Sequence, residues 1–425
     1  MTDGTTTDSL HAPLARSAII LTIGNLGASV LNYGSNIVFG RLLGPLGYAE
    51  LSTLLSLTVV LGVVATAGQT VLAERISHYR LLGDRHTAAY LGRHAAAHMG
   101  TIGIGVAIAV LVSTPLLMSV FQVREPGPMI ALAALCTVTF VFPVALGMAQ
   151  GLELSGAYAV LVLAAAAGRL VVGSIWGMLG GGPGGALAGQ AIGIVLASLV
   201  ALVALRGQGL AAGHGALTAG FKRRPNLRAM QASGTYILFA VLSNVDMIAA
   251  KAVLSPYQAG LYACVSAFVK IVAYLPAAAL ILVVPRIVSA ADDAARRSVL
   301  RWGALMAVTI MALASIPLVA APEPLVRLMF GSEYVEAAAG VRWGALAGCG
   351  LGLISLLVTY AVVIDHGRWQ ITLVVGMATF ALMLVIAHET AVDVIRAQVL
   401  AVIAALLVNE ATFHALLFPR RTTSE

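Results

Sequence analysis

The chain has little charge. Only 10% of its 425 residues are charged, whereas a soluble domain carries about 25%. Hydrophobic residues make up 60%. A shortage of charge with so many apolar side chains is what a hydrocarbon environment requires. The composition therefore excludes an ordinary soluble domain and predicts a membrane protein.

Reactive groups are also scarce. The three cysteines, Cys136, Cys264 and Cys349, lie in apolar stretches and form no CxxC or metal-ligand spacing, so we interpret them as small buried side chains. The sequence has no HExxH, GxSxG or Walker motif. We therefore expect no enzyme activity, no metal and no cofactor.

Long apolar stretches dominate the remainder. A helix needs about 20 apolar residues to cross a bilayer, and we count twelve such spans. They are residues 17–40, 48–72, 96–120, 127–149, 156–178, 184–205, 229–250, 258–285, 302–320, 342–363, 370–387 and 396–417. The fold class is thus predicted to be all-α, a polytopic membrane protein with about 12 transmembrane helices.

The basic residues predict the orientation. If the N-terminus is inside, only six of the 25 Lys and Arg residues fall in outer segments, and a basic excess marks the cytoplasmic side. We therefore place both termini in the cytoplasm and the chain in the inner (cytoplasmic) membrane. The net charge of +7 then reflects basic loops beside membrane lipids. No basic run is interleaved with aromatic residues, so we expect no nucleic-acid partner.

Two parts of the chain look like copies of each other. Residues 42–76 and 253–287 each combine a Pro/Gly turn, an apolar span and a basic exit; Pro45 pairs with Pro256 and Tyr48 with Tyr262. In the flanks, Asn36 aligns with Asp246 and Arg41 with Lys251. Duplicated halves are typical of secondary transporters.

The duplication predicts two six-helix bundles. Because six spans is an even number, both halves enter from the same side, which implies a pseudo-two-fold axis along the membrane normal. The predicted parts are a cytoplasmic tail (1–16), an N-terminal bundle (17–205), a cytoplasmic linker (206–228), a C-terminal bundle (229–417) and a second tail (418–425).

Charges inside the spans are the first functional candidates, because each costs about 2.5–3.5 kcal/mol at a helix centre. Arg169 and Lys270 lie near the middles of spans five and eight, and we predict that both attract an anionic substrate. The alternatives are an internal hydrogen bond to backbone carbonyls for Arg169, and pairing with Asp246 or snorkelling for Lys270. Asp246 either carries a proton or sodium ion or is a fixed partner of a lysine; Glu410 is a second coupling candidate.

A polar stripe is the second candidate. Asn25, Ser29, Asn32 and Asn36 recur at helical spacing in span one and share one face. They either bond a neighbouring helix or form a wall that meets sugar hydroxyls.

Two further patterns predict local packing. Gly340, Gly344, Gly348 and Gly352 repeat every fourth residue, which lets a neighbouring backbone approach closely. The outer segment 321–341 has apolar residues at helical spacing and predicts a short helix lying in the membrane interface.

Several of these segments resemble a known family. NYGSNIVFGRLLGPLGYAELS (32–52), its copy at 244–287, PLVRLMFGSEYVEAA (324–338) and Gln150-Gly151 look like the polysaccharide transporter family, which contains the Wzx-type flippases. That family belongs to the multidrug/oligosaccharidyl-lipid/polysaccharide (MOP) exporter superfamily. The resemblance implies two bundles around a central cavity, worked by alternating access.

The resemblance also implies a substrate, an undecaprenyl-diphosphate-linked oligosaccharide moved across the cytoplasmic membrane for cell-surface polysaccharide biosynthesis. Basic residues would meet the diphosphate and the polar stripe the sugars, and Arg41 and Lys251 join the candidates through the matching junctions. One alternative is a multidrug or cation antiporter of the same superfamily, for which acidic cavity residues are expected. A membrane polymerase or ligase would need a larger outer loop than this chain has.

The orientation predicts a labelling pattern. A cysteine at position 215 or 298, in a chain without its native cysteines, should react with a membrane-impermeant maleimide only from the cytoplasmic side. We would compare intact cells with inverted membrane vesicles. Labelling of either position in intact cells would overturn the topology.

Overall fold

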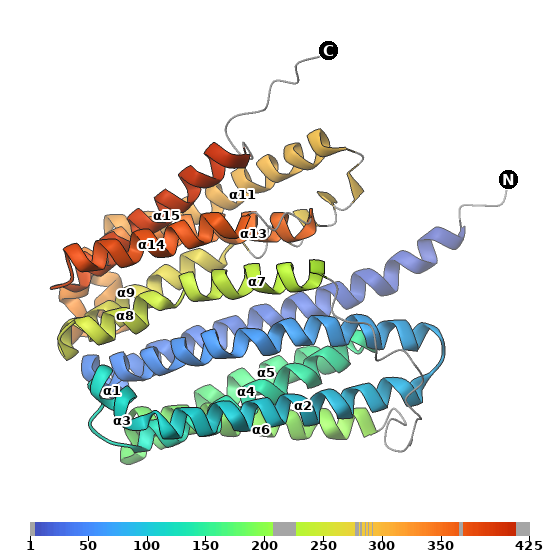
Figure 1. Cartoon of the computed structure of the whole chain (residues 1–425), viewed down its shortest axis with the longest axis horizontal. Helices are drawn as coiled ribbons and strands as arrows, with labels where there is room; N and C mark the ends of the chain where they lie inside the picture. Colours follow the sequence, from blue (N-terminus) through green and yellow to red (C-terminus); the bar gives the residue numbers. More distant parts are fainter. Residues whose placement is uncertain are drawn as a thin grey trace, which may run out of the picture. The chain divides into compact units, whose positions relative to one another are not determined.

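The computed structural model describes residues 5–206, 227–276, 280, 283–284, 286–287, 289–290, 292–364 and 369–413. The predicted linker falls almost wholly outside these residues, as do position 215, the second tail and the start of the first. Every regular element in the described part is helical (Figure 1). This confirms the predicted all-α class.

The chain divides into two compact units. Unit 1 comprises residues 1–43, 61–119 and 123–223, and unit 2 comprises residues 44–60, 120–122 and 224–425. The bounds that we gave for the two bundles stay predictions.

Unit 1 contains most of the elements before residue 207. They are α1 (Thr5–Leu81), α2 (Arg85–Val112), α3 (Thr114–Val120), α4 (Gly127–Gly151), α5 (Ser155–Trp176), the π-helical turn η1 (Gly177–Gly181) and α6 (Gly182–Arg206). Gly44 breaks α1 into two arms with φ 62° and ψ −179°, a conformation that favours glycine because it has no Cβ. Predicted spans one and two are these two arms.

Unit 2 contains the later elements. They are α7 (Leu227–Leu242), α8 (Val245–Val253), α9 (Pro256–Tyr274), α11 (Asp293–Ala320), α12 (Pro322–Met329), the 3₁₀ helix η3 (Ser332–Ala337), α13 (Ala338–Val363), α14 (Gln370–Ile386) and α15 (Ala391–Phe413). Predicted span seven corresponds to the apolar stretch Gln231–Val253. Within it, Ser243 and Asn244 separate α7 from α8, a break that the sequence did not predict.

Eight stretches in the described part are long and apolar enough to cross a membrane. Two of them, Ile19–Leu81 and Ser155–Ala201, run through a sharp turn and hold two helices each. Together with α9 and the shorter apolar α14, these stretches correspond to the predicted spans.

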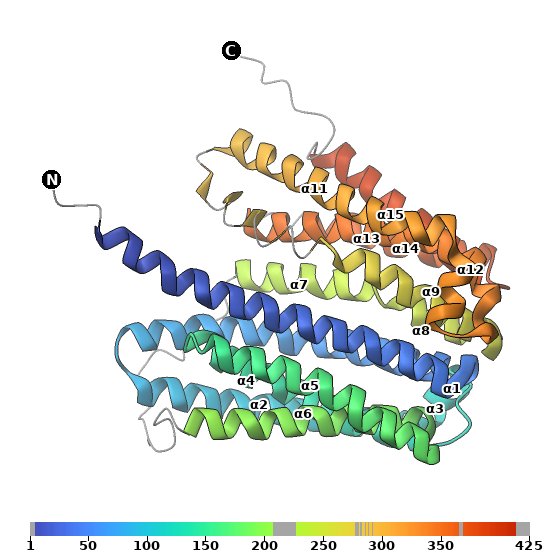
Figure 2. The ribbon, with the colours of Figure 1, turned by 180° about the vertical axis from the view of Figure 1, so that it is seen from behind.

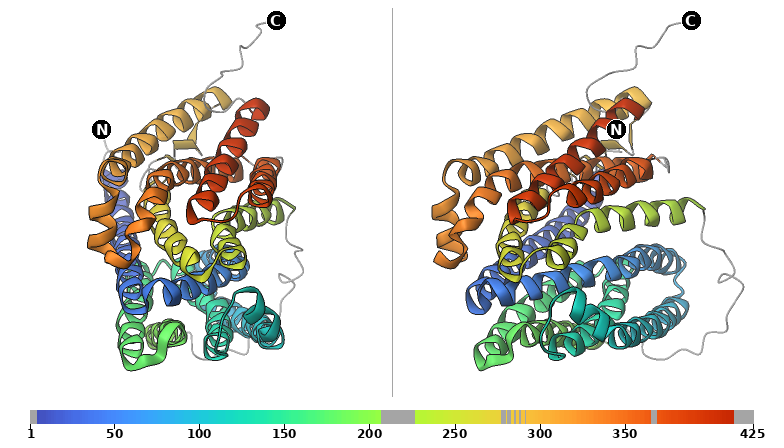
Figure 3. Two further views of the ribbon diagram at one scale, coloured as in Figure 1. Left: turned by 90° about the vertical axis from the view of Figure 1, so that its left-hand side faces the viewer. Right: turned by 60° about the vertical axis from the view of Figure 1, so that its left-hand side comes forward.

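Close helix contacts depend on small residues. α5 and α6 lie side by side in unit 1 (Figure 2), where a Cβ at Gly193 would lie 2.9 Å from the backbone nitrogen of Arg169. α14 and α15 lie side by side in unit 2 (Figure 3). The glycine face of α13 packs against α9, and a Cβ at Gly348 would lie 2.7 Å from the carbonyl oxygen of Val269. The predicted close approach along the glycine repeat is confirmed.

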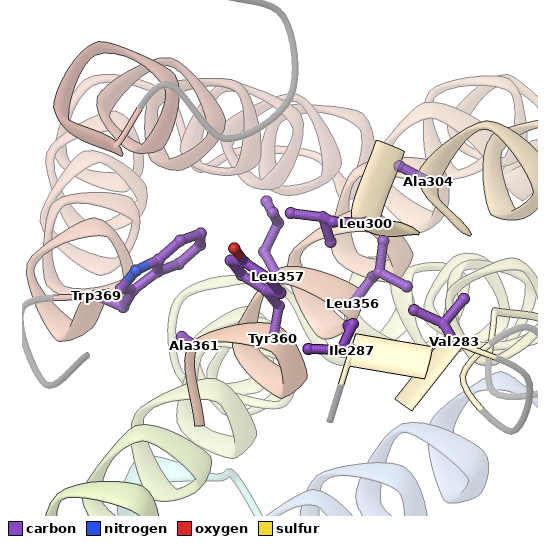
Figure 4. Close-up of a cluster of buried hydrophobic side chains, with 9 residues drawn as sticks. All are labelled: Val283, Ile287, Leu300, Ala304, Leu356, Leu357, Tyr360, Ala361 and Trp369. Atoms are coloured by element: carbon purple, nitrogen blue, oxygen red, sulfur yellow. The ribbon is translucent and has the colours of Figure 1, made fainter. Parts of the chain in front are cut away.

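Buried apolar side chains fill the end of unit 2 that contains Trp369. Figure 4 shows this cluster, to which α11, α13 and the start of α14 contribute. The Trp369 ring stacks on Phe413 with 4.7 Å between centroids and meets Tyr360 edge-on. The cluster ties α15 to the other helices of the unit.

The helix predicted within 321–341 forms as α12, and part of its apolar face packs within unit 2; its place in the membrane interface stays a prediction. Val326 and Phe330 are buried in unit 2, and the Phe330 ring contacts Tyr48, Phe268 and Tyr334 at centroid distances of 5.6–5.7 Å. Tyr48 and Phe268 come from distant sequence positions, so the spacing within the loop could not reveal these two partners.

The glycine packing gives a stability prediction. Gly348→Ala should lower the free energy of unfolding by about 1–3 kcal/mol, because the new Cβ forces α9 and α13 apart. Gly105→Ala is the matched control: a Cβ at Gly105 in α2 meets nothing within 4 Å. It should leave stability unchanged or raise it by up to about 1 kcal/mol. Thermal unfolding of both variants in detergent tests this, and equal Tm values would contradict the packing argument.

Candidate functional site

In unit 1, Arg169 contacts the polar stripe. Its Nη1 donates to Oδ1 of Asn32 at 3.2 Å and its Nη2 donates to Oδ1 of Asn36 at 2.8 Å. The guanidinium carbon lies 5.9 Å from the centre of the Phe39 ring, within cation–π range. The acceptors of these two hydrogen bonds are side-chain amides, whereas the alternative interpretation of Arg169 names backbone carbonyls. Two separately predicted features, the charge and the stripe, form one cluster.

Small residues let α1 and α5 pack closely, which determines where along the two helices these side chains meet. A Cβ at Gly24 would lie 2.6 Å from Cβ of Ala159, so α1 and α5 pack closely at the start of the stripe. A Cβ at Gly173 would lie 2.7 Å from the Phe39 ring. The ring therefore packs directly against the backbone of α5, four residues beyond Arg169. The guanidinium is therefore held in register with Asn32 and Asn36.

The ends of the stripe differ from its centre. Asn25 is exposed, and its side chain lies near the hydroxyl of Tyr158 on α5. Ser29 donates to the carbonyl oxygen of Asn25 at 2.8 Å. Arg41 is exposed at the far end of the first arm of α1, five residues after Asn36.

In unit 2, the break between α7 and α8 gathers polar groups. Ser243 Oγ and Asn244 Nδ2 donate to the carbonyl oxygens of Phe239 and Ala240 at 2.8 and 2.9 Å. Lys270 Nζ donates to Oδ1 of Asn244 at 3.1 Å. Broken helices of this kind mark binding sites in transporters, because the freed backbone groups need polar partners.

Asp246 lies in the first turn of α8 and is only 2% exposed. Its Oδ2 accepts hydrogen bonds from the hydroxyl of Tyr262 at 2.7 Å and from Ser266 at 3.5 Å. Its Oδ1 is buried and receives no hydrogen bond within the described residues. Lys270 acts on Asp246 electrostatically. Asp246, Asn244 and Lys270 therefore form one cluster, although only Asp246 and Lys270 were predicted as site residues.

Gln398 on α15 completes the surroundings of the break, and the sequence analysis missed it. Its Nε2 donates to the carbonyl oxygen of Leu242 at 3.2 Å, and its side chain is fully buried. Its Oε1 is without a hydrogen-bond donor in the described part of the chain. A glutamine inside an apolar span was the available signal.

The remaining candidates lie apart from these contacts. Lys251 is 2% exposed near the end of α8, and the charge of Glu50 acts on it; Glu50 was not predicted. Glu410 is buried on α15 beside Asn409. Among the described residues, no group of three or more His, Cys, Asp or Glu side chains could hold a metal ion.

The model of one protein family matches the chain. Residues 14–291 match the family described as "Polysaccharide biosynthesis protein". No curated protein matches the sequence.

Solved structures share the fold. An inward-facing multidrug resistance MATE family transporter of the MOP superfamily is 12% identical, with a TM-score of 0.67; the match covers 93% of this chain and 97% of that one. The lipid II flippase MurJ, in an inward closed conformation, is 11% identical with a TM-score of 0.71, covering 94% of this chain and 88% of that one. A MOP superfamily transporter from Pyrococcus furiosus is 16% identical, with a TM-score of 0.54 and coverage of 93% and 94%.

The match to the family model spans well over half of the chain, and the structural matches extend over nearly all of it. The chain therefore belongs to the polysaccharide biosynthesis protein family and is a multi-pass membrane protein with the fold of MOP superfamily transporters.

Proposed function

We propose that this protein is a flippase. It moves an undecaprenyl-diphosphate-linked oligosaccharide from the cytoplasmic to the outer leaflet of the inner membrane by alternating access, with both termini in the cytoplasm. The observation that carries the proposal is the Arg169 cluster: a permanent cation inside an apolar span, oriented by two amides. Family membership and the fold shared with a lipid II flippase also support a flippase function.

The chemistry of the cluster suits a diphosphate. A guanidinium stays charged at every physiological pH and offers five N–H donors in a planar fork. Asn32 and Asn36 accept from one N–H on each terminal nitrogen. Guanidinium N–H groups form strong, charge-assisted hydrogen bonds to phosphate oxygens. Because both amides use their oxygens toward Arg169, their NH₂ groups can donate to the same ligand.

The unit 2 cluster suits ion coupling. Oδ1 of Asp246 and Oε1 of Gln398 are both buried acceptors without donors in the described part of the chain, and such groups are costly to leave unsatisfied. A proton or a sodium ion on Asp246 would relieve that cost. Neutralising Asp246 would also weaken its hold on Lys270, which frees that cation to attract the anionic substrate. Substrate and ion would then alternate.

A multidrug or cation antiporter is the second candidate, and the buried carboxylate of Asp246 is the observation that favours it. The two candidates differ in which molecule moves. A reconstituted liposome assay with a fluorescent undecaprenyl-diphosphate oligosaccharide and a cationic dye separates them. Movement of the lipid but not the dye supports the flippase; movement of the dye alone supports the antiporter.

Arg169 should be essential. We expect Arg169→Ala to slow lipid flipping about 10- to 100-fold, the range that corresponds to losing a charge-assisted hydrogen bond of about 1.5–3 kcal/mol. Arg169→Lys should rescue little, because an ammonium cannot bond both amides and a phosphate in one plane. Lys270→Ala should also impair flipping. Arg124→Ala, in the exposed segment before α4, is the matched control.

Initial flipping rates in liposomes containing equal amounts of inserted protein provide the comparison. Wild-type rates for both Arg169→Ala and Lys270→Ala would remove these side chains from the substrate path.

Asp246 should carry the ion dependence. Asp246→Asn keeps the size of the side chain and an acceptor for Tyr262 but cannot be charged. We expect flipping by this variant to lose its response to an imposed proton or sodium gradient. Ser266→Ala removes only the 3.5 Å bond and should keep the response. If Asp246→Asn responds to the gradients as the wild type does, the carboxylate is a structural group.

A further inference from the structure

A second polar cluster lies in unit 1 on the same side of α1 as Asn32 and Asn36. Gln69, on the second arm of α1, donates from Nε2 to Oε1 of Gln150 on α4 at 2.8 Å. The hydroxyl of Tyr158 on α5 lies near enough to the side chains of both Gln69 and Asn25 to interact with them. Asn25, Gln69, Gln150 and Tyr158, which we call the amide cluster, thus lie together where α1, α4 and α5 meet.

The helix backbones are built to bring these side chains together. A Cβ at Gly147 would lie 2.8 Å from the carbonyl oxygen of Gln69, and a Cβ at Gly151 would lie 2.6 Å from that of Ala73. Gln150 therefore sits between two glycines that press α4 against the second arm of α1. On the other side, Gly24 closes α1 onto α5 beside Asn25. The cluster is fixed by backbone packing as well as by its own bonds.

The cluster is accessible although it lies within apolar helices. Asn25 and Gln150 are exposed, and Gln69 and Tyr158 are half-buried. α1 has a separate exposed apolar side formed by Ile19, Ile23, Leu26 and Val30, which suits contact with lipid. Amides that faced lipid tails would lack hydrogen-bond partners at a cost of several kcal/mol. The cluster is therefore suited to face water or a polar ligand.

The chemistry of the cluster differs from that of Arg169. Its members are neutral, and they combine amide donors, amide acceptors, a hydroxyl and an aromatic ring. Tyr158 and Arg169 are eleven residues apart on α5, so they share a face about 16 Å apart along the helix axis. A ligand that reaches both would be anionic at one end and hydroxyl-rich at the other.

We infer that the amide cluster is a glycan-binding subsite that selects for the sugars distal to the lipid diphosphate. Hydroxyl groups both donate and accept, as do the amides of Asn25, Gln69 and Gln150, and the Tyr158 ring offers an apolar face to a sugar ring. The inference rests on the proposed function but adds a separate claim: Arg169 attracts the diphosphate, and the amide cluster determines which glycan length is preferred.

The test uses two lipids in reconstituted liposomes. One is the lipid-linked oligosaccharide pool extracted from cells that naturally make this protein; the other is undecaprenyl diphosphate carrying only the first sugar of that pool. We expect the wild type to flip the complete oligosaccharide faster. Gln150→Ala and Tyr158→Phe should each reduce that preference, and Gln69→Ala combined with Gln150→Ala should reduce it about tenfold, without slowing the single-sugar lipid. Gln190→Ala, an amide on α6 outside the cluster, should keep the preference.

The outcomes separate this inference from the flippase proposal. If the cluster variants slow both lipids equally, or slow neither, the cluster is not a glycan subsite, and the flippase proposal stands because the wild type still moves lipid. If the wild type moves neither lipid, the proposed function fails and the inference fails with it. Tyr158→Phe keeps the ring and removes only the hydroxyl. It leaves no packing defect, so a changed preference would report on the hydroxyl itself.

Discussion

The contact of Arg169 with Asn32 and Asn36 is the constraint on which the arrangement of unit 1 depends. A guanidinium at the centre of an apolar helix costs about 2.5–3.5 kcal/mol, and the amide oxygens offset that cost only within hydrogen-bond distance. Close packing of α1, α5 and α6 is therefore a requirement of the charge. The glycines that allow it, Gly24, Gly173 and Gly193, follow from this constraint.

Unit 2 meets the same constraint differently. Its charges lie where the helix itself is interrupted, and the interruption supplies polar groups. Asn244 occupies the N-cap position of α8, its Nδ2 donates to a freed carbonyl oxygen of α7, and its Oδ1 accepts from Lys270. Gln398, on α15, donates to a second freed carbonyl oxygen of α7, that of Leu242. A broken helix thus provides in unit 2 what paired amides on a continuous helix provide in unit 1.

Periodicity and composition predicted the helices because the bilayer dictates their length and apolarity. They also identified Arg169 and the stripe, but as separate features, since spacing within one helix does not say which helix lies beside it. The break at Ser243 and Asn244 was missed because neither Pro nor Gly marks it. Gln69, Gln150 and Gln398 were missed as site residues because a lone amide in an apolar span carries no spacing signal.

The two halves of the chain share a pattern but have diverged in chemistry. Asn36 aligns with Asp246 in the repeat, yet Asn36 accepts from an arginine, while Asp246 accepts from the hydroxyls of Tyr262 and Ser266. An amide cannot change its charge, whereas a carboxylate can. With Asn36 at this position in unit 1, the side chain is always neutral. With Asp246 at the matching position in unit 2, the side chain can be either charged or neutral. The proposed flippase, which would bind an anion and later release it, needs both properties, and a duplicated fold can provide one in each copy.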